Sequence, residues 1–207
     1  MKILAVADEV SKVYYDYYRE NILKDIDLII GCGDLPREYL EFLVTMASCP
    51  LIYVRGNHDD GYLDHPPAGC ICIEDRLYEY GGLRFLGLGG SGRYRPDGKN
   101  MYSEREMKRR ILRRSWSLFR KGGFDILVTH AAARGCGDLD TPVHRGFSCF
   151  LELMDKYHPG IMVHGHIHSN YGWRTARRSE YHGTAIINAC GHYVFEIGSG
   201  KKEQTGG

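Results

Sequence analysis

The sequence lacks the long apolar runs that membrane insertion requires. None of its 207 residues belongs to an uninterrupted apolar stretch of about 18 residues, the length that spans a bilayer. The apolar run Met1–Ala7 is also too short for the core of a secretory signal, and it meets the acidic pair Asp8 and Glu9 at once. We therefore expect a cytoplasmic protein without membrane contact.

A dominant charge is missing as well. The 27 Lys and Arg residues nearly balance the 26 Asp and Glu residues, which leaves a formal net charge of +1 with neutral histidine. Such a chain has no overall attraction for nucleic acid or for an anionic membrane. Binding to a polyanion would therefore have to come from a local patch.

Paired cysteine motifs are also absent. The seven cysteines are odd in number, scattered, and never spaced as Cys-x-x-Cys. This pattern favours reduced thiols over a disulfide framework or a zinc knuckle. The fold must then come from a hydrophobic core, which a chain of this length is able to bury.

The apolar segments present indicate an α/β fold. Short apolar runs at 2–7, 27–30 and 51–54 alternate with segments of helical spacing at 14–23 and 38–46. This β-α-β-α-β order predicts a parallel sheet whose strands end at a common edge. From residue 70 to 90 the pattern changes to short strands joined by Gly81-Gly82, so we expect a second, more antiparallel sheet to begin there.

A long basic helix is predicted at residues 103–121. Ser103 and Glu106 have the spacing of a capping box, and Gly122-Gly123 ends the segment. Two apolar rows should form its buried stripe, with the basic residues from Arg105 to Arg114 mostly outward. The rows are Met107, Ile111 and Leu118, and Leu112, Trp116 and Phe119.

The rest of the chain predicts a single domain over 1–197 and a flexible C-terminal tail over 198–207. We expect a strand at 125–129, a helix at 147–157 and a strand at 160–164. Residues 184–188 and 193–197 are predicted to pair as terminal strands.

Residues able to bind metal follow these apolar runs one after another. They are Asp8, Asp34, Asn57, His130, His166 and His168. Side chains at the ends of parallel strands gather at one edge of a sheet, so we expect the six to converge. Carboxylate, amide and imidazole ligands suit Mn, Fe, Zn or Co, and no sulfur ligand is needed. Asp34 is our candidate to bridge two such ions, about 3.5–4 Å apart.

In this order, the motifs Asp8, Gly33-Asp34, Gly56-Asn57-His58-Asp59, His130 and Gly165-His166-x-His168 resemble the calcineurin-like metallophosphoesterase superfamily, across residues 2–194. The resemblance implies a four-layer α/β/β/α sandwich with two mixed sheets and a site for two divalent metal ions. It implies that Asp8, Asp34 and His168 bind the first ion. By the same resemblance Asp34, Asn57, His130 and His166 bind the second, while His58 protonates the leaving group and Asp59 orients His58.

One position departs from the superfamily pattern. The first motif is usually Asp-x-His, and here Val10 stands in the place of the histidine. Strand alternation should turn Glu9 away from the face that Asp8 uses. We therefore expect the first site to hold its metal more weakly than the second, with exchangeable or sub-stoichiometric metal.

These features favour a metal-dependent phosphoesterase, specifically a phosphodiesterase on a small or nucleotide-like ester, acting by in-line attack of a metal-bound hydroxide. Arg93 and Arg134, in loops at the rim of the site, are candidates to bind the substrate phosphate. One alternative is a nuclease that uses the basic helix face from Arg105 to Arg114. The other is a scaffold protein that keeps the fold without the reaction. The sequence leaves the oligomeric state open.

Overall fold

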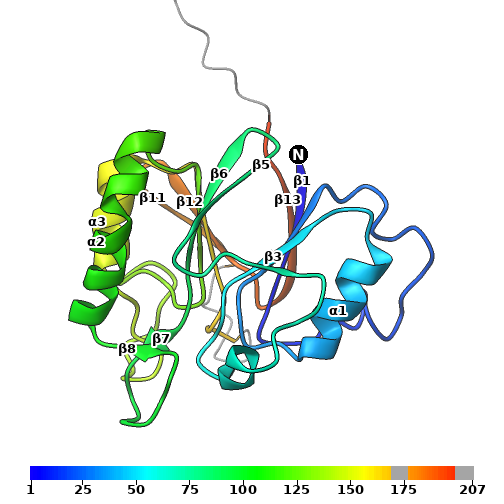
Figure 1. The fold of residues 1–207 in the computed structure, drawn as a ribbon, viewed down its shortest axis with the longest axis horizontal. Helices are drawn as coiled ribbons and strands as arrows, with labels where there is room; N and C mark the ends of the chain where they lie inside the picture. The colour runs from blue at the N-terminus through cyan, green and yellow to red at the C-terminus, as the bar shows by residue number, and fades with distance from the viewer. Residues whose placement is uncertain (169–176, 199–207) are drawn as a thin grey trace, which may run out of the picture.

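The computed structural model describes residues 1–168 and 177–198, and two large mixed sheets organise them (Figure 1). The first sheet has the order β13-β1-β2-β3-β4, in which only β13 runs antiparallel, against β1. Its strands are β1 (Lys2–Ala7), β2 (Leu28–Gly31), β3 (Leu51–Tyr53), β4 (Ile71–Cys72) and β13 (Gly191–Glu196).

The second sheet has the order β11-β12-β10-β9-β6-β5. Its strands are β5 (Leu77–Tyr80), β6 (Leu83–Leu88), β9 (Ile126–Thr129), β10 (Ile161–His164), β11 (Arg178–Tyr181) and β12 (Thr184–Asn188). The four central strands are parallel, and the edge strands β5 and β11 are antiparallel to their neighbours. A separate short pair joins β7 (Ser91–Gly92) to β8 (Met101–Tyr102).

The helices lie on the outer faces of the two sheets. In Figure 1, α1 (Arg37–Met46) lies beside the first sheet, while α2 (Glu104–Lys121) and α3 (Ser148–Tyr157) lie together beside the second. A short 3-10 helix, η1 (Asp60–Leu63), follows the third motif. In residues 1–168 and 177–198, no helix combines the length and the apolar character needed to cross a bilayer.

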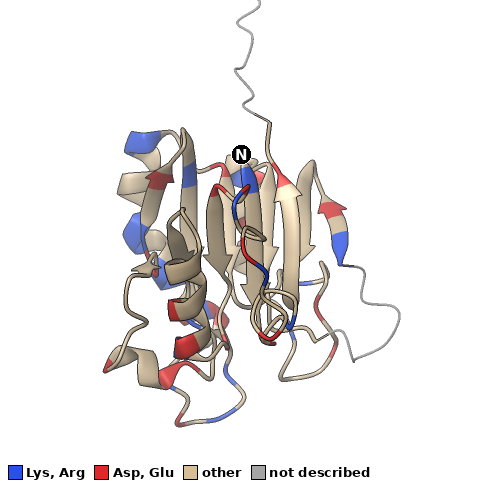
Figure 2. Cartoon of the chain, turned by 90° about the vertical axis from the view of Figure 1, so that its right-hand side faces the viewer, with Lys and Arg blue, Asp and Glu red and all other residues tan. Residues whose placement is uncertain are grey.

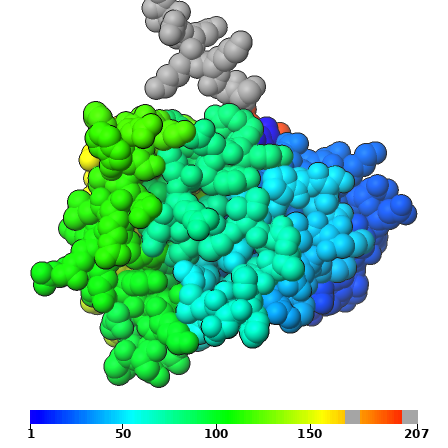
Figure 3. All heavy atoms as spheres, viewed as in Figure 1, coloured from blue at the N-terminus to red at the C-terminus, as the bar shows by residue number. Residues whose placement is uncertain are grey.

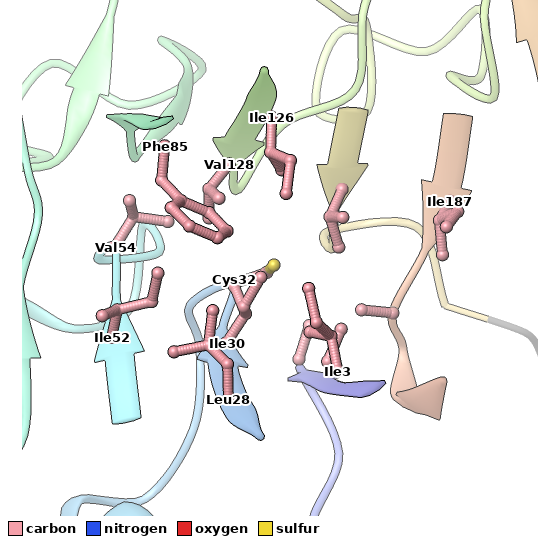
Figure 4. Packing of buried hydrophobic residues seen from close by; sticks show 14 of the residues in the cluster. Ile3, Leu28, Ile30, Cys32, Ile52, Val54, Phe85, Ile126, Val128 and Ile187 are labelled. Carbon is pink, nitrogen blue, oxygen red and sulfur yellow. The ribbon is translucent and has the colours of Figure 1, made fainter. Parts of the chain in front are cut away.

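Three clusters of buried residues fill the space between these layers. One packs α1 against β1, β2 and β3, and another packs α2 and α3 against the second sheet. The third lies between the sheets, where Ile3, Leu28 and Ile52 face Phe85 and Ile126 (Figure 4). Alternation along each strand supplies the two faces of each sheet. The predicted α/β/β/α sandwich with two mixed sheets is therefore confirmed.

On the face drawn in Figure 3, the N-terminal part of the chain lies beside its middle part. Figure 2 shows charged residues of both signs in the view that it draws. Apart from Gly198, the predicted tail lies outside the described residues.

Several element predictions need correction. Residues 14–23 form successive turns instead of a helix, with hydrogen bonds such as Ile22 N to the Arg19 carbonyl and a left-handed Asn21. Aromatic and β-branched residues are poor helix formers, which weakens this segment. The two C-terminal strands do not pair with each other, because β12 joins β10 and β11 whereas β13 joins β1. Strand β4 belongs to the first sheet, and the centre of the second sheet is parallel.

Helix α2 begins and ends as predicted but presents a different face to the core. The Ser103 and Glu106 capping box is present, and left-handed Gly122 ends the helix. Leu112, Trp116 and Phe119 are 68%, 69% and 76% exposed, so the second apolar row is not buried. The side chain of Arg110 is buried instead, and it pairs with Glu74 and Asp75.

Candidate metal centre

The carboxyl ends of strands from both sheets meet at one site. Asp8 directly follows β1, Asp34 lies three residues after β2, and His130 directly follows β9. His166 lies two residues after β10. Asp8, Asp34 and His166 have φ angles of 62°, 55° and 67°. This left-handed backbone turns each side chain sharply off its strand, and such strain is typical of functional sites.

Two motif glycines allow the loops to approach one another. A Cβ on Gly56 would lie 2.0 Å from Oδ1 of Asp34, and one on Gly165 would lie 2.6 Å from the Cβ of Ala7. Both distances are too short for any larger residue. The glycines of these motifs are therefore needed to bring the candidate ligands together.

The best-formed part of the site contains Asp34, His130, His166 and Asn57. Donor atoms of the first three lie within 4.8 Å of one another. Nε2 of His130 lies 3.0 Å from Oδ1 of Asn57 and 3.3 Å from Oδ2 of Asp34. The structure thus brings together the four residues that the resemblance assigns to the second ion.

The remaining ring nitrogens have backbone partners that fix the rings. Nδ1 of His130 lies 2.8 Å from the Cys32 carbonyl, and Nε2 of His166 lies 2.8 Å from the Val143 carbonyl. A carbonyl only accepts, so these nitrogens donate, and the other nitrogen of each ring is turned to the opposite side. Backbone carbonyls commonly orient metal-binding histidines in this way.

The charges of this cluster also fit a cation. Burial would lower the pKa of His130, but the Asp34 carboxylate raises it to about 9. Burial would raise the pKa of Asp34, but the charge of His130 and the amide of His58 hold it at about 2. Burial lowers the pKa of His166 to about 3, so this ring is neutral. A divalent cation on the same atoms would displace the His130 proton.

The ligands predicted for the first ion are arranged differently. Both Asp8 oxygens accept the His166 amide, at 3.0 and 2.9 Å, and burial raises the pKa of Asp8 to about 6. His168 forms a separate group with Glu9 and Cys190. The possible donor atoms of these three residues all lie within 4.8 Å of one another. The expectation that Glu9 points away is wrong, because β1 ends at Ala7 and the left-handed Asp8 breaks the strand alternation.

His58 and Asp59 make separate contacts. The His58 side chain is exposed, and its amide donates to Oδ1 of Asp34 at 2.8 Å. Oδ2 of Asp59 accepts the amides of Asp34 and Gly56 at 2.8 and 2.7 Å, and burial raises the pKa of Asp59 to about 6. The Asp59 carboxylate thus holds the backbone of the loops that carry Asp34 and Asn57, and that it orients His58 stays a prediction.

The candidate substrate arginines line one cavity of about 440 Å³, together with Arg145. Arg93 donates to both oxygens of Glu106, and Nε of Arg134 donates to the Gly146 carbonyl at 2.9 Å. Pro142 also lines the cavity and directly precedes Val143, whose carbonyl orients His166. None of the described candidate metal ligands lines the cavity, so Pro142 and Val143 are its link to the cluster.

Four residues near the site were missed at the level of sequence. They are Glu9, Tyr94, His144 and Cys190. The Tyr94 hydroxyl accepts from Nδ2 of Asn57 at 3.2 Å, and the ring of His144 lies 5.3 Å from that of His166. None belongs to a motif with recognisable spacing, although Tyr94 directly follows Arg93, whose loop was expected at the rim of the site.

The chain belongs to the calcineurin-like phosphoesterase family, whose model matches residues 1–170. This is a family of metal-dependent phosphoesterases, which typically use two divalent metal ions. The match agrees with the cluster of carboxylate, amide and imidazole ligands at the strand ends.

Solved structures agree on the fold. One superposes with a TM-score of 0.66 at 10% identity, covering 93% of each chain. The protein TT1561 of Thermus thermophilus superposes with a TM-score of 0.60 at 14% identity, covering 91% of this chain and 88% of its own. GAP50, the anchor in the inner membrane complex of Plasmodium, gives 0.52 at 13% identity over 91% and 70%. No curated protein matches the sequence.

Proposed function

We propose that the protein is a phosphodiesterase that hydrolyses a small or nucleotide-like phosphate ester by in-line attack of water. The observation that carries the proposal is the cluster of Asp34, Asn57, His130 and His166, with oriented rings, beside an exposed His58. Two divalent cations, from among Mn, Fe, Zn and Co, would supply charge neutralisation and activation of water. Asp34 is the proposed bridge between the two ions.

His58 is the proposed general acid. Its amide is held by the Asp34 carboxylate, which fixes the residue at the edge of the cluster while its side chain remains exposed. From there the imidazole would give a proton to the departing ester oxygen. A positioned acid of this kind contributes roughly 10²–10⁴-fold to the rate.

The candidate substrate arginines favour a diester over a monoester. Arg93 is paired with Glu106, Arg145 with Asp140, and Arg134 lies 3.9 Å from Asp138. Each guanidinium thus has an acidic neighbour, and Glu104 also lines the cavity, so little positive charge is left uncompensated there. A singly charged diester needs less compensation than a doubly charged monoester.

We also propose a cytoplasmic location. All seven cysteines lie among the described residues, and none of them forms a disulfide. Reduced thiols are usual in that compartment.

Hydrolysis of bis-p-nitrophenyl phosphate and p-nitrophenyl phosphate with added Mn²⁺ tests the function. We expect faster turnover of the diester. His58→Ala should keep its metal and lose roughly 10²–10⁴-fold in kcat, whereas Asp34→Asn should lose both metal and turnover. His65→Ala, at an exposed histidine that no motif contains, is the matched control and should behave as wild type.

Measuring metal content together with turnover distinguishes an active enzyme from a scaffold that only binds metal. If wild type binds metal and still hydrolyses neither ester with Mn²⁺, Zn²⁺ or Co²⁺, the protein is a scaffold of this fold and the proposal is wrong. Equal turnover by wild type and His58→Ala would remove His58 from the mechanism.

A further inference from the structure

A second group of metal-binding side chains lies beside the cluster of Asp34, His130 and His166. It contains Glu9, His168 and Cys190, whose donor atoms all lie within 4.8 Å of one another. Of these, only His168 belongs to a motif recognised in the sequence. The group lies where the first ion of the pair is expected, next to the chain segment in which Val10 replaces a histidine. Val10 offers no donor atom, and it packs against the buried cluster below α1.

Glu9 reaches this position because the chain turns sharply after β1. Asp8 has a φ of 62°, and the amide of Glu9 donates back to the Ala7 carbonyl at 2.6 Å. The turn directs the Glu9 side chain across the strand ends, where Oε1 lies 3.4 Å from Nδ1 of His168. A carboxylate is thus brought to the imidazole by the backbone that also turns Asp8 into the site.

Cys190 is held in place by the connection between the two sheets. It lies between β12 and β13, forms an isolated bridge with Ala7, and is 7% exposed. The buried Asn188 fixes it, since Oδ1 of Asn188 accepts the Cys190 amide at 3.0 Å. Nδ2 of the same side chain donates to the carbonyl of Ile167 at 2.7 Å, beside His168. The Asn188 side chain therefore holds Cys190 beside the Gly165-His166-x-His168 motif.

The donor set differs in kind from the neighbouring cluster. Carboxylate, imidazole and thiolate together form a set that zinc accepts in tetrahedral sites, with a fourth position for water or another carboxylate. Mn²⁺ and Mg²⁺ prefer oxygen ligands, and a thiolate selects the softer ion. Asp8 directly precedes Glu9 in the chain, so its carboxylate is the candidate fourth ligand.

We propose that Glu9, His168 and Cys190 form a zinc site at the first-ion position, in which the Cys190 thiolate takes over the role of the histidine that Val10 replaces. This proposal rests on the proposed function in one respect, since it assumes that a second ion binds at the neighbouring cluster of Asp34, His130 and His166. The protein would then hold two unlike ions, a thiolate-bound zinc beside an ion held by oxygen and nitrogen. The first site would be selective for zinc instead of merely weak.

Cobalt substitution of the wild-type protein tests the proposal directly. Co²⁺ bound to a thiolate gives a charge-transfer band in the near ultraviolet, which oxygen and nitrogen ligands do not give. We expect this band in the wild-type chain, lost on titration with Zn²⁺. Absence of the band in the cobalt-loaded wild-type protein would overturn the proposal. Because the measurement uses the wild-type chain, it does not depend on whether a variant folds.

Cys190→Ser identifies the sulfur, and Cys49→Ser is the matched control. Cys49 is half-buried and lies two residues before β3, at the end of that strand away from the loops that carry the candidate ligands. In Cys190→Ser we expect loss of the cobalt band and at least a tenfold rise in the zinc dissociation constant, with Mn²⁺ binding at the second site unchanged. Cys49→Ser should keep the band. Equal zinc affinity in wild type and Cys190→Ser would contradict the proposal.

The two proposals fail separately. A thiolate band in a protein without turnover would uphold the zinc site and refute the phosphodiesterase. Turnover in a protein without the band would uphold the phosphodiesterase and refute the zinc site.

Discussion

At the scale of single residues, the site depends on backbone conformations that the sequence does not display. Three of the seven described non-glycine residues with positive φ are the candidate ligands Asp8, Asp34 and His166. Each such conformation costs on the order of 1–3 kcal/mol, which the surrounding contacts must offset. Motif order predicted which side chains would meet, because it follows the strand ends. It did not predict that the turn at Asp8 would bring Glu9 into the site.

Gly165→Ala tests how far these loops depend on close approach. The added Cβ would lie 2.6 Å from the Cβ of Ala7 and 2.8 Å from Oδ2 of Asp8, so it must displace Asp8. We expect at least tenfold weaker metal binding, measured by titration calorimetry. Gly61→Ala is the control, since its Cβ would meet no atom within 4 Å. Metal affinity unchanged by Gly165→Ala would show that the loops adjust freely.

Asp59→Ala separates support of the backbone from catalysis. The change leaves the buried amides of Asp34 and Gly56 without their acceptor, at about 1–3 kcal/mol each. We therefore expect about 2–4 kcal/mol lower stability in urea and weaker metal binding. A group that acted only on His58 would instead lower kcat with metal content and stability intact. That second pattern would support the predicted role of Asp59 in orienting His58.

At the scale of the element, α2 shows what periodicity determines and what it leaves open. The capping box and the terminal glycine define its ends, and both were predicted correctly. Its two apolar rows lie roughly 120° apart around the axis at 3.6 residues per turn, so a sheet is able to cover only one of them. The row with Met107 and Leu118 is buried because Arg110, beside it, pairs with Glu74. A partner 36 residues away is invisible to local periodicity.

The ion pair of Arg110 and Glu74 connects α2 to the metal-binding loops. Glu74 also accepts the amide of Arg55, which precedes Gly56, and the amide of Gly89. Arg110→Ala leaves the buried Glu74 carboxylate with only the Arg55 guanidinium, whose Nε lies 3.9 Å away, so we expect a loss of about 3–5 kcal/mol in the free energy of unfolding. Urea denaturation measures it, with the exposed Arg109→Ala as control. A change below about 1 kcal/mol, within the range of surface pairs, would show that the pair contributes little.

At the scale of the whole molecule, the candidate site joins the two sheets. Asp8, Asp34 and Asn57 follow strands of the first sheet, whereas His130 and His166 follow strands of the second. The sequence predicted convergence from the common edge of parallel strands. It could not predict which terminal strand returns to which sheet, because β12 and β13 have similar apolar patterns. Their separation places Cys190 at the junction, where local patterns give no signal.

A ligand that bridges the two sheets should stabilise the whole fold against unfolding. An ion that binds only the folded chain adds about 2.7 kcal/mol when its concentration is about 100 times its dissociation constant. For a chain of this size that corresponds to a rise in Tm of roughly 5–10 °C. Differential scanning calorimetry of the metal-free protein, with and without added Mn²⁺ or Zn²⁺, measures the rise. Asp34→Asn should abolish most of it, because the other ligands then lack the proposed bridging carboxylate. If added metal leaves the Tm of the wild-type chain unchanged, the strand ends of the two sheets do not share a bound ion.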